Sequence, residues 1–227
     1  MICLIDGDVI AYIAAYDNTE EEAQAALDSL IPSITDCVFG DSARIAVKGD
    51  NNFRHEVFDD YKGNRNKAGN EEHRAFINRL RDYMVQCHDA EEAHGQEADD
   101  LLAQWAQECM EAKLDYAIAS IDKDLLTIPG VHFNIRKGLL THVDDDAADY
   151  LLHKQLLMGD SADNIPGLPG IGHKRAENLL NGITYGNRRQ TVIQAYKDQY
   201  GEDWEDELQL TGDLILIRRF KDVRFKI

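Results

Sequence analysis

Long apolar runs are missing from this sequence of 227 residues. No stretch approaches the roughly 18 to 20 apolar residues that a membrane-crossing helix needs. The N-terminal run Met-Ile-Cys-Leu-Ile-Asp-Gly-Asp also lacks the basic start and long apolar core of a signal peptide. Cysteine is scarce, and the four cysteines lie far apart with no paired spacing, which argues against disulfides and against a zinc site. We therefore expect a cytoplasmic protein with reduced thiols and no membrane partner.

Motifs of several common enzyme classes are absent as well. The eight histidines are scattered and show no HExxH or similar spacing, and no G-x-S-x-G pattern occurs. The glycine-rich run at 167–172 has the wrong spacing for a P-loop and no predicted strand before it. These absences argue against a zinc peptidase, a serine hydrolase and a P-loop nucleotidase.

Basic residues are fewer than acidic ones, and the chain has a formal net charge of −18. This balance argues against a general nucleic-acid coat protein, which would be basic. It does not exclude a nuclease, because carboxylates clustered in one site are partly neutralised by bound cations.

Short apolar runs alternate with helical patterns along a chain that is 44% hydrophobic, enough for a sizeable core. Helices are expected from 9 to 16 and from 20 to 38, where Thr19 and Glu22 have capping-box spacing. Later helices are expected through 74–81, after 100, from 146 to 158, and near 188–200 and 203–218. Strands are expected at 2–5, 43–48, 116–120, 131–135 and 139–143. This alternation predicts a parallel sheet with helices on both faces.

Acidic residues follow the predicted strands or begin the next helices. They are Asp6, Asp50, Glu97, Asp99, Asp100, Asp122 and Asp124. Because the carboxyl ends of parallel strands meet along one edge of a sheet, we expect these side chains in a single cleft. Such a cluster is hard to sustain without cations, and hard oxygen ligands point to Mg²⁺ or Mn²⁺. Two ions about 4 Å apart would suit in-line displacement at a phosphodiester.

Residues 158–180 combine two acids with a glycine-rich turn. Asp160 and Asp163 are three residues apart, so a helical turn would place both carboxylates on one side. The prolines and glycines that follow force a tight turn, and the free N–H groups of the next helix form a phosphate-binding position beside Lys174 and Arg175. The alternative is a helix-loop-helix whose glycines only make the turn, with Asp163 as an N-cap.

Two other segments are basic. The first joins an aromatic ring, cations and flexible glycines, and it suits a phosphate-binding loop or, alternatively, a solvated surface loop. Its residues are Tyr61, Lys62, Arg65 and Lys67. The second is the C-terminal tail, which either touches a duplex or is a solvated end. Its residues are Arg218, Arg219, Lys221, Arg224 and Lys226.

Five of these pieces, in this order over residues 1–180, resemble the 5′-3′ exonuclease and flap endonuclease family, especially its small phage and bacterial members. Each piece is weak alone, and the five together are highly specific. The glycine-rich turn resembles the family's helix-three-turn-helix. The five pieces are Leu4-Ile5-Asp6-Gly7-Asp8, residues 60–65 (Asp-Tyr-Lys-Gly-Asn-Arg), Glu97-Ala98-Asp99-Asp100, residues 120–124 (Ser-Ile-Asp-Lys-Asp) and residues 158–165 (Met-Gly-Asp-Ser-Ala-Asp-Asn-Ile).

The resemblance implies a PIN-like α/β fold with a mostly parallel sheet flanked by helices and a C-terminal helical subdomain. The nuclease domain would span residues 1–145, with 64–94 as the arch or gateway for the 5′ strand. Residues 146–227 would form the duplex-binding helix-three-turn-helix and the basic tail.

The resemblance also assigns roles to single residues. Asp6, Asp50, Glu97 and Asp99 would be centred on the first metal. Asp122, Asp124, Asp160 and Asp163 would be centred on the second, with Asp100 nearby. Lys62 and Arg65 match the family's cations at the scissile phosphate, and Tyr12 matches an aromatic residue that stacks on a terminal base. The remaining nucleic-acid contacts would be Tyr61, Lys67, Gly167, Gly170, Gly172, Lys174 and Arg175, with K⁺ held at the glycine turn.

The expected function is therefore structure-specific 5′ nuclease activity on DNA with two Mg²⁺ ions, which Mn²⁺ can replace, giving 5′-phosphate products. The partner would be DNA with a 5′ end, flap or nick, bound by a monomer in the cytoplasm of a bacterium or a phage-infected cell during replication, repair or phage DNA metabolism. A PIN-type ribonuclease is an alternative that would share the acids but not need the duplex-binding turn. A junction-binding protein without catalysis is another, against which the complete acid set argues.

Overall fold

The computed structural model describes residues 1–64 and 71–227, and these fall into two compact units. Unit 1 is built from Met1–Asn52, Ala68–Val143 and Ile217–Lys221, and unit 2 from Phe53–Lys67, Asp144–Leu216 and Asp222–Ile227, less residues 65–70. Within the described ranges, no helix is at once long enough and apolar enough to cross a membrane. The predicted division of functions between residues 1–145 and 146–227 stays a prediction.

Unit 1 is organised around a six-stranded sheet in the order β3-β2-β1-β4-β5-β6. The strands are β1 Ile2–Asp6, β2 Ser42–Lys48, β3 Glu91–Ala93, β4 Tyr116–Ser120, β5 Gly130–Asn134 and β6 Leu139–Val143. Neighbours from β3 to β5 pair in parallel, and β6 runs antiparallel to β5. The expected mostly parallel sheet is confirmed, and β3 is a strand that the apolar pattern did not predict because it is short and acidic.

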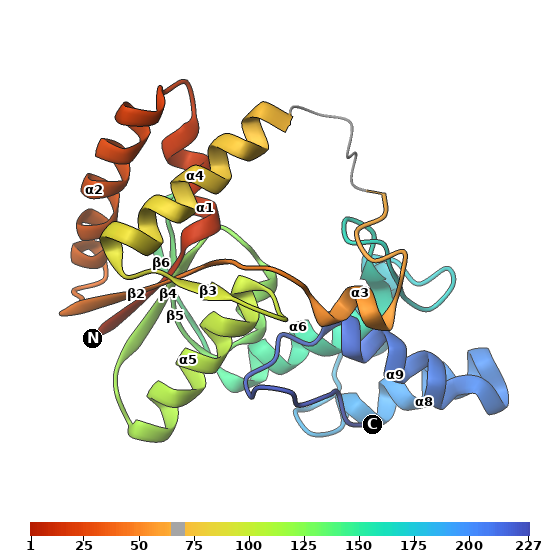
Figure 1. Ribbon diagram of the computed structural model, residues 1–227. Coiled ribbons are helices and arrows are strands. Elements are labelled where there is room, and N and C mark those ends of the chain that lie inside the picture. Colours follow the sequence, from red (N-terminus) through yellow and green to blue (C-terminus); the bar gives the residue numbers. More distant parts are fainter. Residues whose placement is uncertain (65–70) are drawn as a thin grey trace. The chain divides into compact units, whose positions relative to one another are not determined.

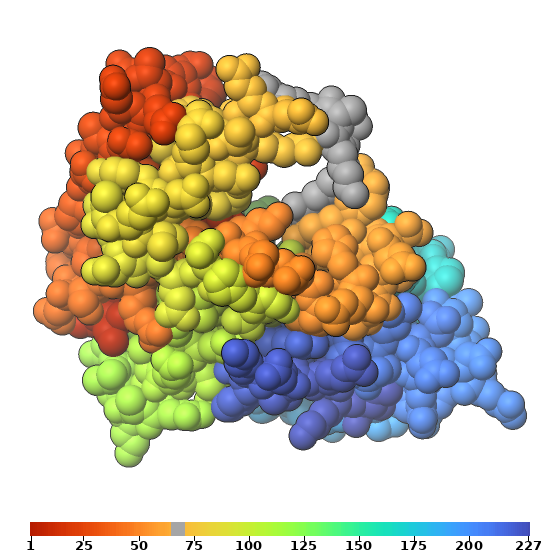
Figure 2. Space-filling model, viewed as in Figure 1, coloured from red at the N-terminus to blue at the C-terminus, as the bar shows by residue number. Residues whose placement is uncertain are grey.

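The helices of unit 1 cover both faces of this sheet (Figure 1). They are α1 Gly7–Ala15, α2 Glu20–Cys37, α4 Glu71–His88, α5 Ala98–Ala112 and the 3₁₀ turn η1 Asp124–Thr127. The predicted capping box between Thr19 and Glu22 begins α2. Figure 2 shows α4, in yellow, packed beside the red-orange α2. An ion pair joins the two helices, with Arg79 Nε 2.7 Å from Glu20 Oε2.

Strand β1 shows how the sequence pattern produces this layering. Successive strand residues point to opposite faces. Cys3 and Ile5 accordingly belong to the core under α1, α2 and α4, whereas Leu4 belongs to the core under α5. All three are fully buried, so β1 reads as one continuous apolar run, as central parallel strands do.

Unit 2 is helical. Its elements are α3 Phe53–Val57, α6 Asp145–Met158, α7 His173–Leu180, α8 Arg188–Tyr200, η2 Gly201–Asp203, α9 Trp204–Ile215 and a small hairpin of β7 Gly159–Asp160 and β8 Ile165–Pro166. The helical turn expected to carry Asp160 and Asp163 is wrong. Gly159, at φ +66°, leaves the helical conformation, and its neighbour Asp160 pairs with Ile165 in the hairpin.

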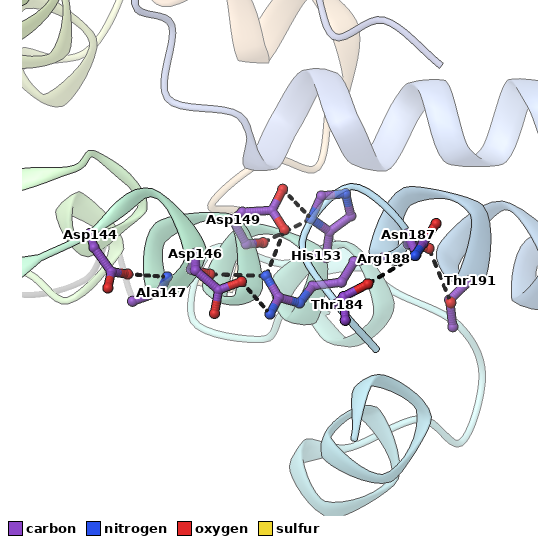
Figure 3. A network of polar contacts seen from close by, with 9 residues as sticks. All are labelled: Asp144, Asp146, Ala147, Asp149, His153, Thr184, Asn187, Arg188 and Thr191. Atoms are coloured by element: carbon purple, nitrogen blue, oxygen red, sulfur yellow. Dashed lines mark hydrogen bonds and ion pairs between the residues drawn. The ribbon is translucent and has the colours of Figure 1, made fainter. Parts of the chain in front are cut away.

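Polar contacts fasten α6 to α8 within unit 2 (Figure 3). The side chain of Arg188 is nearly buried, and its two terminal nitrogens each lie 2.8 Å from a carboxylate oxygen of Asp146 or Asp149. Asp144 caps α6 by accepting from Ala147 N at 2.8 Å. The start of α6 is therefore held both by its own cap and by a cation from α8.

Candidate active site

The acids of unit 1 begin where the order of strand addition reverses, between β1 and β4. From β1 the chain builds outward through β2 to β3, and then β4 pairs with the other side of β1. Asp6 is the last residue of β1, and Asp122 follows the end of β4. Ligands of open α/β sheets bind at such switch points, beyond the carboxyl ends of the strands.

Asp6 is held in a defined orientation. Its side chain is buried, Oδ1 accepts from Val9 N at 3.1 Å to cap α1, and Oδ2 accepts from Ser120 Oγ at 2.7 Å. The pKa of Asp6 is raised to about 6, first by burial and then by the negative charges of Asp8 and Asp122, while the hydrogen bonds from Ser120 and Val9 oppose this shift. Asp6 is thus a buried carboxyl group in a negative field.

Asp99 shows that the acids converge. The pKa of Asp99 is raised well above its ordinary value, first by loss of solvent around the carboxyl group and then by neighbouring negative charges. Those charges belong to Asp6, Asp122, Glu97 and Asp100. Carboxylates brought this close repel one another, so a bound cation would relieve a real cost.

Asp100 has a different environment from Asp99. It is completely buried, its Oδ2 accepts from Glu97 N at 3.0 Å, and its Oδ1 accepts from Arg218 N at 2.8 Å. Both carboxylate oxygens therefore receive backbone N–H groups, which ties the start of α5 to the C-terminal segment. The predicted place of Asp100 near a metal stays a prediction, and the observed bonds point to a positioning role.

The segment after β4 is ordered by Ser120, for which the sequence predicted no role. Ser120 Oγ accepts from Asp122 N at 3.0 Å while it donates to Asp6. Asp122 Oδ1 in turn accepts from Asp124 N at 2.9 Å. The sequence feature that could have indicated this role is a hydroxyl side chain at the last position of β4, just before Asp122 and Asp124.

Asp50 and Asp8 complete the acids near the ends of β1 and β2. The exposed Asp50 side chain pairs through Oδ1 with His94 Nδ1, and its role as a metal ligand stays a prediction. Asp8, which had no predicted role, accepts at Oδ1 from Arg81 Nε at 2.7 Å and from Lys48 N at 3.1 Å. Arg81 therefore joins α4 to the start of α1.

A divalent cation fits this donor set. The converging side chains offer hard carboxylate oxygens, which Mg²⁺ and Mn²⁺ prefer. Within the described residues, no three His, Cys, Asp or Glu side chains are already arranged around one ion position. The carboxylates are thus close enough to perturb one another without forming a closed ligand set.

In unit 2, Asp163 is surrounded by residues of the predicted phosphate-binding loop. Its Oδ2 accepts from Tyr61 Oη at 3.2 Å and lies 3.4 Å from Lys62 Nζ, while Lys62 N donates to Asp163 O at 2.8 Å. Tyr61 differs from the expectation of a nucleic-acid contact, because its ring is only 3% exposed and packs in the core of unit 2. In this structure the Tyr61 hydroxyl group donates to Asp163 and so helps to orient that carboxylate.

The glycine-rich turn leads into α7 as predicted. Gly167 is in close contact, since an added Cβ would lie 2.1 Å from the carbonyl carbon of Met158. Gly170, at φ +73°, accepts through its carbonyl from Arg175 Nη1 at 2.8 Å. Gly172 caps α7 with open space where a Cβ would be, and Lys174 is exposed one residue into the helix. The turn therefore presents backbone and cations to solvent.

The remaining predicted residues are Tyr12 and two cations, Arg65 and Lys67, whose sequence positions fall in the predicted arch region 64–94. Tyr12 of α1 is 52% exposed, and its ring centroid lies 5.9 Å from that of His73 on α4. Arg65 and Lys67 lie outside the described residues, so their predicted contacts with phosphate and nucleic acid stay predictions.

Sequence comparison links the chain to a known family and to bacterial polymerases. The family model of the 5′-3′ exonuclease, N-terminal resolvase-like domain, matches residues 1–150. The DNA polymerase I of Geobacillus stearothermophilus is 30% identical over 187 residues, which cover 75% of this chain and 21% of that protein. The chain thus spans about a fifth of the length of this curated relative.

Solved structures resemble the whole fold. The T5 D15 protein crystallised with metal ions superposes with a TM-score of 0.72 at 21% identity, covering 95% of this chain and 86% of that chain. The bacteriophage T5 D15 flap endonuclease in a complex with DNA and metal ions gives a TM-score of 0.67 at 20% identity, covering 95% and 98%. At this identity the likeness concerns the fold, and it confirms the predicted PIN-like class.

Proposed function

The chain belongs to the 5′-3′ exonuclease family, and from this premise we propose that it is a divalent-metal-dependent nuclease that hydrolyses DNA phosphodiesters at or near a 5′ end. The observation that supports this proposal most is that the negative charges of Asp6, Glu97 and Asp122 act together on Asp99, whose pKa is raised first by burial and then by these charges. Gathering these acids costs free energy, and bound cations would offset that cost.

The residues that would hold the cations are the carboxylates at the ends of β1 and β4 and at the start of α5. Asp6, Glu97, Asp99 and Asp122 are the proposed ligands in unit 1, and binding would draw them into a closed set. Bound divalent cations supply charge neutralisation and Lewis acidity at a phosphodiester. We propose Mg²⁺ as the resident ion, with Mn²⁺ able to replace it, and two ions per molecule.

The protein's own residues orient this set. Ser120 holds one oxygen of Asp6 toward β4 and at the same time fixes the backbone of Asp122. The cap that Asp6 gives to α1 fixes its second oxygen. The Asp6 carboxylate therefore has little rotational freedom to lose when it binds an ion, which favours binding.

Unit 2 supplies the proposed contacts with nucleic acid. Lys62 would stabilise negative charge on phosphoryl oxygens, as would Arg65. The turn through Gly167, Gly170 and Gly172, with Lys174 and Arg175, would bind a duplex backbone and would also hold K⁺. The exposed ring of Tyr12 on unit 1 would stack on a terminal base. Asp124, Asp160 and Asp163 stay predicted partners of the second ion, and Asp50 of the first.

The substrate preference is tested by digestion of end-labelled 5′-flap, nicked, blunt and single-stranded DNA with titrated Mg²⁺. We expect cleavage near the 5′ end that leaves 5′-phosphates and stops in EDTA. A matched RNA series separates this activity from that of a ribonuclease. Binding to junctions without cleavage at any Mg²⁺ or Mn²⁺ concentration would contradict the proposed activity.

Single substitutions test the acids. Asp122→Asn is expected to lower the cleavage rate at least 100-fold with the fold intact, because it removes one charge from the proposed ligand set. Asp160→Asn tests the predicted second-ion role in the same way. Asp115→Asn is the matched control, since Asp115 is exposed and lies at the opposite end of β4. Full Mg²⁺-dependent activity in both Asp122→Asn and Asp160→Asn, with circular dichroism unchanged, would remove the proposed site.

A further inference from the structure

The C-terminal segment after α9 returns to unit 1 and runs beside α5 (Figure 1). Ile217 is buried in the core that α5 forms with the sheet. Two residues of the predicted basic tail follow it, Arg218 and Arg219. They are not part of a solvated end. Arg218 is 9% exposed and Arg219 is partly buried.

This segment contacts both of the elements that carry the acids. Arg218 N donates to Asp100 Oδ1 at 2.8 Å, and Asp100 Oδ2 accepts from Glu97 N, so the segment is bonded to the start of α5. Arg219 Nη2 donates to Thr127 O at 3.1 Å, at the end of η1. Residues 217–219, which we call the C-terminal strap, therefore join two acidic segments that are far apart in sequence.

From Thr127 a continuous line of hydrogen bonds leads to the first acid. Thr127 Oγ1 donates to Asp124 O at 2.7 Å, and Asp124 N donates to Asp122 Oδ1 at 2.9 Å. Asp122 N then donates to Ser120 Oγ, which donates to Asp6 Oδ2. Each link fixes the residue that orients the next.

We propose that the C-terminal strap is a positioning element that holds the acids of α5 and of the segment after β4 in register for metal binding, and that Arg219 is its positioning residue. The inference rests on the proposed function, because it concerns the same acids. It assigns to Arg219 a bond inside unit 1 in place of contact with a duplex. Partners that orient metal ligands typically change metal affinity or activity by about 10- to 100-fold when removed.

The test compares Arg219→Ala, Arg219→Lys and the control Lys221→Ala in the full chain. Lys221 is exposed and lies two residues beyond Arg219, so its substitution removes the same charge from the same segment. Mg²⁺ binding is measured by calorimetry without DNA, and KM for a 5′-flap DNA and kcat are measured over a Mg²⁺ series. Hydrogen exchange of the Asp124 amide reports whether the line of bonds has loosened.

We expect Arg219→Ala to weaken Mg²⁺ binding about 10-fold, to speed exchange at Asp124, and to lower kcat at limiting Mg²⁺ with KM for DNA unchanged. High Mg²⁺ should restore kcat. Arg219→Lys should recover part of the affinity, because a lysine can still donate to Thr127 O, and Lys221→Ala should bind Mg²⁺ like the parent protein.

Two results would overturn the proposal. One is parental Mg²⁺ affinity and parental exchange in Arg219→Ala. The other is an equal, salt-dependent rise of KM in Arg219→Ala and Lys221→Ala with Mg²⁺ binding intact, which would make the segment a duplex contact. If the parent protein cleaves no DNA but loses Mg²⁺ affinity in Arg219→Ala, the proposed function fails and the strap stands.

Discussion

Asp6 shows how much one side chain does in this protein. It ends β1, caps α1 through Val9 N and accepts from Ser120 Oγ, all while buried in a field of other acids. The first role follows from its position in the sequence. The bond to Ser120 joins residues 114 positions apart, so only the pairing of β1 with β4 creates it.

Asp6→Asn is expected to stabilise the metal-free protein at pH 7.5. The folded protein raises the pKa of Asp6 from 3.8 to about 6, so the folded state holds this proton more tightly than the unfolded state. The contribution of protonated Asp6 to the free energy of unfolding is therefore fully present below about pH 4 and is lost as the pH rises through 6. The loss is about 3 kcal/mol. Asparagine carries no charge and can still accept from Val9 N, so it avoids this loss.

Urea unfolding in EDTA between pH 4 and 8 measures this effect. The parent protein should lose more stability than Asp6→Asn as the pH rises through 6. Parallel curves for the two proteins would show that the Asp6 carboxyl group is not destabilised by its surroundings.

Among the elements, the β7-β8 hairpin and the glycine turn after it depend most on close backbone contact. Gly159 has φ +66°, and an added Cβ would lie 2.3 Å from Ile165 O. Sequence spacing suggested a helical turn for Asp160 and Asp163 because it counts only separation along the chain. The pairing of Gly159 with Pro166 instead turns the chain back, and spacing between the two acids does not reveal this local hairpin.

Gly167→Ala and Gly172→Ala are expected to differ strongly in their effect on the free energy of unfolding. Gly167→Ala should destabilise the protein by about 3 kcal/mol, since its Cβ would overlap the Met158 carbonyl group. Gly172→Ala should change stability by less than about 0.5 kcal/mol, because its surroundings are open and its φ of −99° suits alanine. If the turn binds a duplex backbone, Gly172→Ala should still weaken DNA binding.

Urea unfolding and DNA-binding titrations on both variants check this pair. Equal stability of the two variants would contradict the packing at Gly167. Parental DNA affinity in Gly172→Ala would count against a close backbone approach at that glycine.

For the whole molecule, the net charge of −18 is partly concentrated at the ends of β1 and β4. A cation that binds the folded state alone raises its stability by RT ln(1 + [L]/Kd), which is about 2.7 kcal/mol at 100 times the Kd. The proposed cleavage activity and the free energy of unfolding should therefore both depend on the same ion.

Mg²⁺ is expected to raise the unfolding midpoint by about 5–10 °C at a concentration 100 times its Kd, beyond the effect of NaCl at equal ionic strength. Asp99→Asn should reduce this excess, because Asp99 lies where the negative charges converge. Thermal unfolding in matched salts measures it. The same excess in Asp99→Asn as in the parent would place the stabilising ion elsewhere.

Local pattern was enough to predict the strands of the sheet apart from β3, the capping box of α2, the helix after the glycine turn and the acids that follow β1 and β4. These features depend on neighbours along the chain, and periodicity, caps and turn residues encode neighbours. Packing alone decided that Tyr61 lies in a core, that Asp100 bonds to Arg218 N and that Ile217 is buried in the core under α5. Asp100 and Arg218 are 118 positions apart, and no local pattern specifies such a pair, because their meeting depends on how every element between them is folded.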